Sequence, residues 1–235
     1  MENGLQIAAA FSYGCGRANY LGISSLLKKF IFSQEGKIEK EVRNSLKRLA
    51  SYPYYKLIAL ASEIDDPFDL RVVKAHWIGN DLLEKISREH IKELIKDKSL
   101  REIGWTKELI VYSMPRLASD RFLAHHNFYA ISELLKFPVL IEKGRNNCWI
   151  IGGKVVKAEK NELIIKCHSL IFDGEFRIGR VREEKIKRGF LRNVKAGDLI
   201  ASHFGEARFI INGKDLENLI KYTQKILDAL GAERE

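Results

Sequence analysis

Residues 149–165 read WIIGGKVVKAEKNELII, and this stretch decides how the second part of the chain folds. Within it, short β-branched runs alternate with the turn residues Gly152-Gly153 and Lys160-Asn161. Comparable runs lie on either side, at Val139-Leu-Ile141, Phe176-Arg-Ile178 and Leu199-Ile-Ala201. Strands at roughly ten-residue spacing, with turn residues between them, are typical of a small antiparallel barrel or sandwich.

Beyond these strands, residues 214–230 carry apolar side chains at helical spacing. They are Leu216, Leu219, Ile220, Tyr222, Ile226 and Leu227. Such a stripe predicts an amphipathic helix, and Gly231 is suited to follow its last turn. We expect this helix to close the barrel.

The chain before the strands has a different pattern. All four prolines precede residue 139, and apolar residues recur at the helical period in residues 5–13, 23–32 and 38–64. Pro53 predicts a break in the last of these, and Asp65-Asp66-Pro67 and Ser87 predict helix starts. We therefore expect an α+β protein, with a helical domain over residues 1–138 and an antiparallel, OB-like barrel plus helix over 139–235.

The composition is that of a folded protein, with 46% hydrophobic and 30% charged residues. The net charge of +9 is spread evenly, because residues 1–140 carry 21 Lys and Arg against 17 Asp and Glu, and residues 141–235 carry 19 against 14. Without a concentrated basic tail, a solvated surface is favoured over a nucleic-acid interface. Few glutamines beside abundant Lys, Glu and Ile are common in thermophiles, including archaeal ones.

Three cysteines without a repeated spacing argue against a disulfide framework and fit a reducing cytosol. The first residues do not resemble a signal peptide, and no apolar run approaches the roughly 18 residues of a membrane span. We expect a cytoplasmic protein that does not enter a membrane.

Two segments of the second part carry a resemblance: CWIIGGKV at residues 148–155 and VKAGDLIASHFGEA at 194–207. They resemble the HypC/HupF family of hydrogenase assembly chaperones, over about residues 146–230. The later segment follows the family pattern at Val194, Gly197, Asp198, His203, Gly205 and Ala207. Two positions differ: the family's cysteine begins the mature chain whereas Cys148 is internal, and the family's proline is Gly152 here.

The resemblance implies an OB-like barrel that presents Cys148 and His203 to an iron–cyanide–carbonyl fragment. Cys148 would be a soft thiolate ligand, and His203 a second ligand or an orienting group. The implied partner is a hydrogenase large subunit or a maturation factor. On the residues alone, Cys148 is better explained as a small buried hydrophobe and His203 as a hydrogen-bonded residue at the barrel rim. With the resemblance included, the structural and the ligand roles are equally favoured. The adjacent Cys167 and His168 face opposite sides of a strand, so we treat them as structural.

The helical domain offers weaker candidates. On one continuous helix, Asp69, His76 and Asn80 would share a face. His125 and His126 form a second cluster, which with Asp69 and His76 is a candidate metal or enzyme site without diagnostic spacing. These residues are better explained as buried polar groups that hold a helical core.

Cys15, in a glycine-flanked turn, would be an activated thiol if it lay at a helix N-terminus. The whole chain also looks like an uncharacterised family that we associate with archaea and actinobacteria, and this likeness implies no chemistry.

The leading hypothesis is a hydrogenase-linked accessory protein that binds a partner or an iron fragment without turnover. One alternative is single-stranded nucleic-acid binding by the barrel, whose most basic stretch is Arg177, Arg180, Arg182, Lys185, Lys187 and Arg188. A steep salt dependence of binding distinguishes it. The other alternative is an enzyme in the helical domain, which requires Asp69, His76, His125 and His126 to converge on one pocket.

Overall fold

The computed structural model describes residues 3–15, 21–33, 38–136, 148–172 and 174–231. The chain forms two compact units, a helical unit of residues 1–125 and a barrel unit of residues 126–235. The boundary expected at 138/139 and the strand expected at 139–141 lie outside the described residues. The helix that begins at His126 belongs to the barrel unit.

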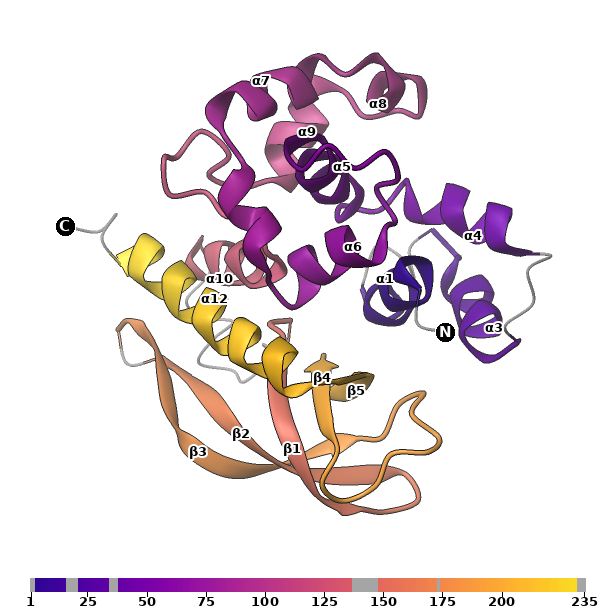
Figure 1. Cartoon of the computed structure of the whole chain (residues 1–235), viewed down its shortest axis with the longest axis vertical. Coiled ribbons are helices and arrows are strands. Elements are labelled where there is room, and N and C mark those ends of the chain that lie inside the picture. Colours follow the sequence, from indigo (N-terminus) through magenta and orange to yellow (C-terminus); the bar gives the residue numbers. More distant parts are fainter. Residues whose placement is uncertain (1–2, 16–20, 34–37, 137–147, 173, 232–235) are drawn as a thin grey trace. The chain divides into compact units, whose positions relative to one another are not determined.

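The helical unit consists of short helices, as predicted (Figure 1). In chain order they are α1 (Gly4–Ser12), α3 (Ser24–Ser33), α4 (Glu39–Leu46), α5 (Tyr52–Ala61), α6 (Leu70–Trp77), the 3₁₀ helix η2 (Asp81–Lys85), α7 (Arg88–Lys96), α8 (Lys98–Glu102) and α9 (Lys107–Ser113). The predicted break near Pro53 is confirmed. It falls between α4 and α5, and Pro53 lies in the first turn of α5, where its missing N–H costs no helical hydrogen bond.

Large aromatic side chains from α1, α5 and α6 form much of this unit's core. Phe11 stacks on Trp77 with ring centroids 4.9 Å apart. The indole Nε1 of Trp77 donates to the hydroxyl of Tyr55 at 2.5 Å, and the hydroxyl of Tyr54 donates to the Ser113 carbonyl at 3.0 Å. Each buried polar tip therefore has a partner, which removes the cost of burying it.

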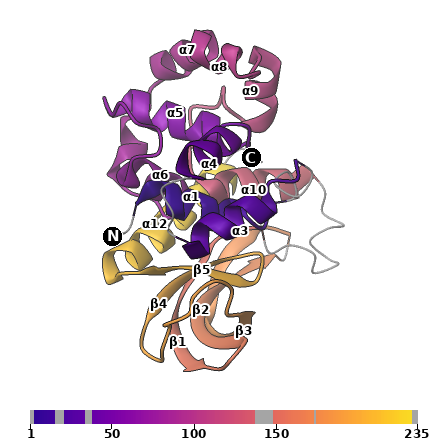
Figure 2. The ribbon, with the colours of Figure 1, turned by 90° about the vertical axis from the view of Figure 1, so that its right-hand side faces the viewer.

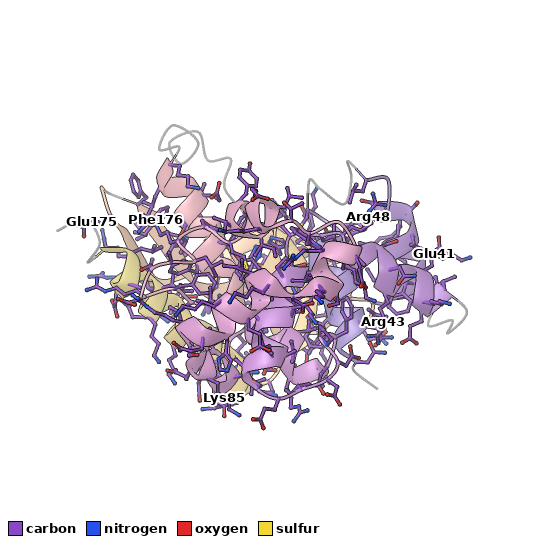
Figure 3. All side chains as sticks on the ribbon, turned by 90° about the horizontal axis from the view of Figure 1, so that it is seen from above. Glu41, Arg43, Arg48, Lys85, Glu175 and Phe176 are labelled. Atoms are coloured by element: carbon purple, nitrogen blue, oxygen red, sulfur yellow. The ribbon has the colours of Figure 1, made fainter. Side chains whose placement is uncertain are left out.

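The helix start predicted at Asp65-Asp66-Pro67 is wrong, because α6 begins only at Leu70. The Asp66 carboxylate instead accepts from the Phe68 N–H at 2.9 Å and from the Arg43 guanidinium at 2.7 Å. Arg43, labelled on α4 in Figure 3, also lies 5.0 Å from the centre of the Phe68 ring. Asp66 thus forms a turn that docks on α4, and Asp69 takes the N-cap.

The barrel unit contains a closed barrel of five strands, preceded by helix α10 (His126–Lys136) and followed by α12 (Gly213–Gly231). The strands are β1 (Ile151–Ala158), β2 (Glu162–Phe172), β3 (Phe176–Lys187), β4 (Leu199–His203) and β5 (Glu206–Ile211), in the spatial order β1-β2-β3-β5-β4. The barrel and its C-terminal helix are confirmed. The expectation of a wholly antiparallel sheet is wrong, because β3 and β5 pair in parallel at Lys187 and Glu206.

The parallel contact follows from the β4–β5 hairpin. β4 runs antiparallel to β1, and β5 returns beside it and reaches the remaining edge of β3 in the same direction as β3. The turn between β4 and β5 consists of Phe204 and Gly205, whose φ angles are 56° and 65°. Two successive positive φ values match the twist of a two-residue hairpin. The barrel closes between β3 and β5 through the one residue pair of Lys187 and Glu206, at the C-terminal end of β3.

Branched side chains fill the barrel, as the alternation in the sequence predicts. Its core comprises Val155, Leu163, Ile165, Cys167, Ile186, Val194, Ile200 and Ala207. Cys167 is buried in it, whereas His168 faces outward and contacts the Gly179 carbonyl at 3.0 Å through Nδ1. These two neighbours therefore cannot share one ion.

Helix α12 lies along the barrel and beside α10 in both views (Figures 1 and 2). It approaches β1 closely at Gly152. A Cβ atom at Gly152 would lie 2.6 Å from Cδ1 of Leu216 and 3.0 Å from Cδ2 of Leu219. A larger residue at this position would displace the ends of these two leucine side chains, so the packing of α12 on β1 favours glycine here.

Candidate metal centre

Three potential ligand atoms meet in the barrel unit, from His126, Cys148 and His203. All three lie within 4.8 Å of one another. The Cys148 Sγ is 3.7 Å from Nε2 of His126 and 3.8 Å from Nε2 of His203. The two imidazole rings meet edge to face, with centroids 4.8 Å apart. Among the residues that the structure describes, this is the one His, Cys, Asp or Glu cluster with such geometry.

Each residue comes from a different element. His126 is the first residue of α10, Cys148 lies shortly before β1, and His203 is the last residue of β4. Pairing of β4 with β1 brings His203 toward Cys148, since Ser202 is opposite Ile151. The site therefore exists only once the strands are paired.

Asn127 holds the first turn of α10 against the segment before β1. Its side-chain amide donates to the Ile150 carbonyl at 3.1 Å and to Oγ1 of Thr223 at 3.0 Å, and its Oδ1 accepts from the Ile150 N–H at 2.6 Å. Asn127 is itself buried. This network fixes His126 beside Cys148, because Asn127 is adjacent to the first and Ile150 is near the second.

The site is closed on the imidazole side and open on the thiol side. His126 and His203 are buried, whereas Cys148 is half-buried. The His203 ring also packs on Phe204, with centroids 4.3 Å apart, and Phe204 remains 39% exposed. A ligand or partner would therefore reach the cluster past Cys148, beside an exposed aromatic ring.

The donor set fits a transition metal. A thiolate with two imidazoles suits zinc, iron and copper, whereas magnesium and calcium prefer oxygen ligands. A metal held at about 2.3 Å from sulfur and about 2.0–2.1 Å from nitrogen, with tetrahedral angles, separates those two atoms by about 3.6 Å. The sulfur–nitrogen distances of 3.7 and 3.8 Å are close to this separation.

In the helical unit, the structure does not place Asp69, His76 and Asn80 on one helix face. Helix α6 begins after Asp69 and ends before Asn80. Asp69 caps α6, and its hydrogen bonds with Arg71 lower the pKa of its carboxyl group. Asn80 starts η2, with its Oδ1 accepting from the Leu82 N–H and its Nδ2 donating to the Arg71 carbonyl. Asp69 and Asn80 thus each cap the start of a helix instead of forming a row with His76.

His76 and His125 are buried inside the helical unit. His76 contacts the Ala124 carbonyl through Nδ1 at 3.0 Å and packs against the rings of Tyr54 and Trp77. Burial lowers the pKa of His125 to about 4, although a hydrogen bond to the backbone of Ile78 partly offsets the shift. His125 is therefore neutral at physiological pH.

Cys15 follows the C-terminal end of α1, not a helix N-terminus as the activated-thiol hypothesis requires. Its Sγ lies 3.9 Å from the Phe11 carbonyl of that helix. A helix C-terminus carries a partial negative charge and does not favour a thiolate.

All three residues of the cluster are candidates by sequence, but His126 was predicted to lie with His125 and the other candidates of the helical domain. The structure places His126 in the barrel unit, as the first residue of α10, whereas His125 precedes the helix and belongs to the helical unit. No signal in the sequence connects His126 with a cysteine 22 positions later, because the link depends on the fold of the barrel unit.

The chain belongs to a family of unknown function, DUF6390, which matches residues 2–235. This agrees with the expected likeness to an uncharacterised family. No curated protein and no solved structure matches the chain. Among the described residues, no helix has the length and apolar character needed to cross a membrane.

Proposed function

We propose that this protein is a hydrogenase-linked accessory protein that binds an iron-containing fragment, and a protein partner that receives it, through Cys148 and His203. It acts by binding and delivery, without turnover. The observation that carries this proposal is the 3.8 Å separation between Sγ of Cys148 and Nε2 of His203. The resemblance to the HypC/HupF family requires these two side chains to meet, although they are 55 residues apart in the chain.

The surrounding fold supports the same function. A five-stranded closed barrel with a packed helix is compatible with an OB-like module. The two residues lie at neighbouring strand ends, where a cargo can be held without disturbing the barrel core. Thiolate sulfur suits low-spin iron that already carries strong-field diatomic ligands, and a neutral imidazole can complete or orient the site.

Partial exposure of Cys148 suits delivery. A carrier must release its cargo, and a ligand at the surface can be exchanged for a ligand of the partner. The exposed Phe204 ring beside His203 supplies apolar contact area for that partner. In this arrangement His203 holds the inner side of the cargo and Cys148 the outer side.

The charge pattern of the barrel disfavours nucleic-acid binding. Arg182 pairs with Glu184 at 2.7 Å, and Lys185 pairs with Glu162 at 2.6 Å. The Arg188 guanidinium donates to the backbone carbonyls of Glu159, Leu191, Arg192 and Val194. Half of the basic stretch is thus engaged within the barrel unit, which reduces its capacity to release counterions from phosphates.

The test is metal analysis with infrared spectroscopy on protein purified anaerobically from its own organism. We expect iron with cyanide and carbonyl stretching bands in the wild type. Cys148→Ser should lose both, because serine is a poor ligand for such iron. Cys15→Ser is the matched control, since Cys15 is also half-buried and lies in the helical unit, and it should keep the bands.

Two results would overturn the proposal. The first is wild-type protein that is folded but carries neither iron nor the bands when the hydrogenase system is expressed. The second is a Cys148→Ser variant that retains both at the wild-type level. Capture of a hydrogenase large subunit or maturation factor, measured in parallel, should follow the same order of variants.

A further inference from the structure

We propose that His126 is the third ligand of a Cys/His₂ site for a divalent first-row metal, zinc or iron(II). This inference rests on the proposed binding at Cys148 and His203 and extends it to helix α10. The pair of ligands expected from the resemblance lies wholly at the barrel, whereas His126 belongs to a helix that precedes it. The helix therefore contributes to the site and is more than a covering element.

The imidazoles of His126 and His203 lie at nearly the same distance from the Cys148 thiol. Sγ of Cys148 lies 3.7 Å from Nε2 of His126 and 3.8 Å from Nε2 of His203. Neither imidazole has a privileged position relative to the thiol. If the distance to the Cys148 sulfur qualifies His203 as a ligand, the same distance qualifies His126.

His126 can act as a metal ligand if the proton on its imidazole ring moves from Nε2 to Nδ1. Its Nε2 is 3.0 Å from the Cys148 carbonyl, a contact that requires the proton on Nε2. Metal binding needs a lone pair on Nε2, so the ring must take the tautomer with its proton on Nδ1. The Cys148 thiol loses its proton in the same step, and one proton is released to solvent for each metal bound.

Three protein ligands would leave one position open on a tetrahedral metal and three on a six-coordinate iron. The described residues offer no fourth His, Cys, Asp or Glu in the cluster. Both methionines of the chain, Met1 and Met114, belong to the helical unit, so the barrel unit does not supply the axial thioether of a copper electron-transfer site. A position left open would be available to an external ligand.

The test is titration of the purified full chain with cobalt(II), followed by competition with zinc. Wild type should bind one cobalt, with a near-ultraviolet thiolate-to-cobalt band and the strong visible bands of tetrahedral coordination. His126→Ala and His203→Ala should each weaken binding by more than about 100-fold, since even the partners that orient ligands contribute about 10–100-fold. The control His168→Ala changes an exposed histidine of the same unit and should bind as wild type does.

A replacement ligand separates coordination from a structural role. His126→Cys should restore cobalt binding and increase the thiolate-to-cobalt band, because a second sulfur then coordinates. A merely structural histidine predicts no new band. Circular dichroism and the thermal transition of each variant show that the fold is retained.

The outcomes distinguish this inference from the proposed function. If His126→Ala binds cobalt like wild type while His203→Ala does not, the third ligand is wrong and the Cys148–His203 pair stands. If His203→Ala binds like wild type, the pair itself is wrong. If wild type binds neither cobalt nor zinc, the site inferred here is overturned, and the iron-fragment experiment decides the proposed function separately.

Discussion

The two units of this protein each bury two histidines, and the pairs differ in what surrounds them. His76 lies among tyrosine and tryptophan rings, and His125 lies in the helical core with a strongly lowered pKa. In the barrel unit, His126 and His203 face one thiol. Burial of an imidazole is thus common to structural and candidate functional positions. The convergence of different donor types from separate segments distinguishes the barrel pair.

The most disruptive test of this comparison is His76→Ala. Removal of the ring leaves a cavity among Tyr54, Tyr55 and Trp77 and leaves the Ala124 carbonyl without its imidazole partner. We expect a loss of about 2–4 kcal/mol in the free energy of unfolding, measured by urea denaturation. Cobalt affinity at temperatures below the transition should be unchanged. A loss of cobalt binding in folded His76→Ala would contradict the separation of the two pairs.

His125 predicts a pH dependence of stability. Its pKa is about 4 in the folded protein against 6.5 for an unperturbed histidine, so the unfolded chain binds its proton first as the pH falls. The contribution to stability is fully present above about pH 6.5 and is lost as the pH falls toward 4, by roughly 3 kcal/mol. His125→Asn should flatten this part of the profile. An identical wild-type and variant slope between pH 4 and 6.5 would exclude the effect.

Asn127→Ala should show whether Asn127 only positions His126 or itself coordinates the metal. The substitution removes the bonds to Ile150 and Thr223, at a cost of about 1–3 kcal/mol in unfolding free energy. It should also weaken cobalt binding about 10–100-fold, because α10 no longer holds His126 in place. The cobalt spectrum at saturation should stay that of wild type, since all three ligands remain. A changed spectrum would indicate that Asn127 itself coordinates.

The smallest expected effect concerns the packing of α12 on β1. Gly152→Ala places a methyl group 2.6 Å from Cδ1 of Leu216, and we expect a loss of about 1–2 kcal/mol as the leucine shifts. Gly213→Ala is the matched control, because a Cβ there meets nothing within 4 Å. Thermal denaturation of both variants measures the difference. Equal stability of the two would show that α12 does not constrain β1.

Secondary structure was predictable from the sequence where residues within a few positions determine it. The helices before residue 137, the break near Pro53 and the C-terminal helix are confirmed, because apolar spacing and turn residues act within a few positions. Ser87 was correctly recognised as a helix start, and its capping partner is His90 in place of a glutamate. The start at Pro67 was wrong because Asp66 is used by Arg43, which lies 23 residues away.

Contacts between segments far apart in the chain were harder to predict from the sequence. Strand β5 was not recognised as a separate strand, and its parallel contact with β3 was not foreseen, since a pairing partner leaves no mark in a strand's own pattern. The predicted row of Asp69, His76 and Asn80 was wrong because Asp69 is the N-cap of α6 and Asn80 is the N-cap of the next helix, η2.

The amino-acid order alone was sufficient to divide the chain into a helical and a strand-rich part and to single out Cys148 and His203. The division depends on spacing and on turn chemistry, which are properties of short segments, and the two residues were singled out by the resemblance of two short segments to a family pattern. That His126 belongs with them, and not with His125, was decided only when β1 paired with β4 and Asn127 bonded to Ile150. Three donors from separate elements become neighbours through strand pairing and helix packing, and those contacts exist only in the folded barrel unit.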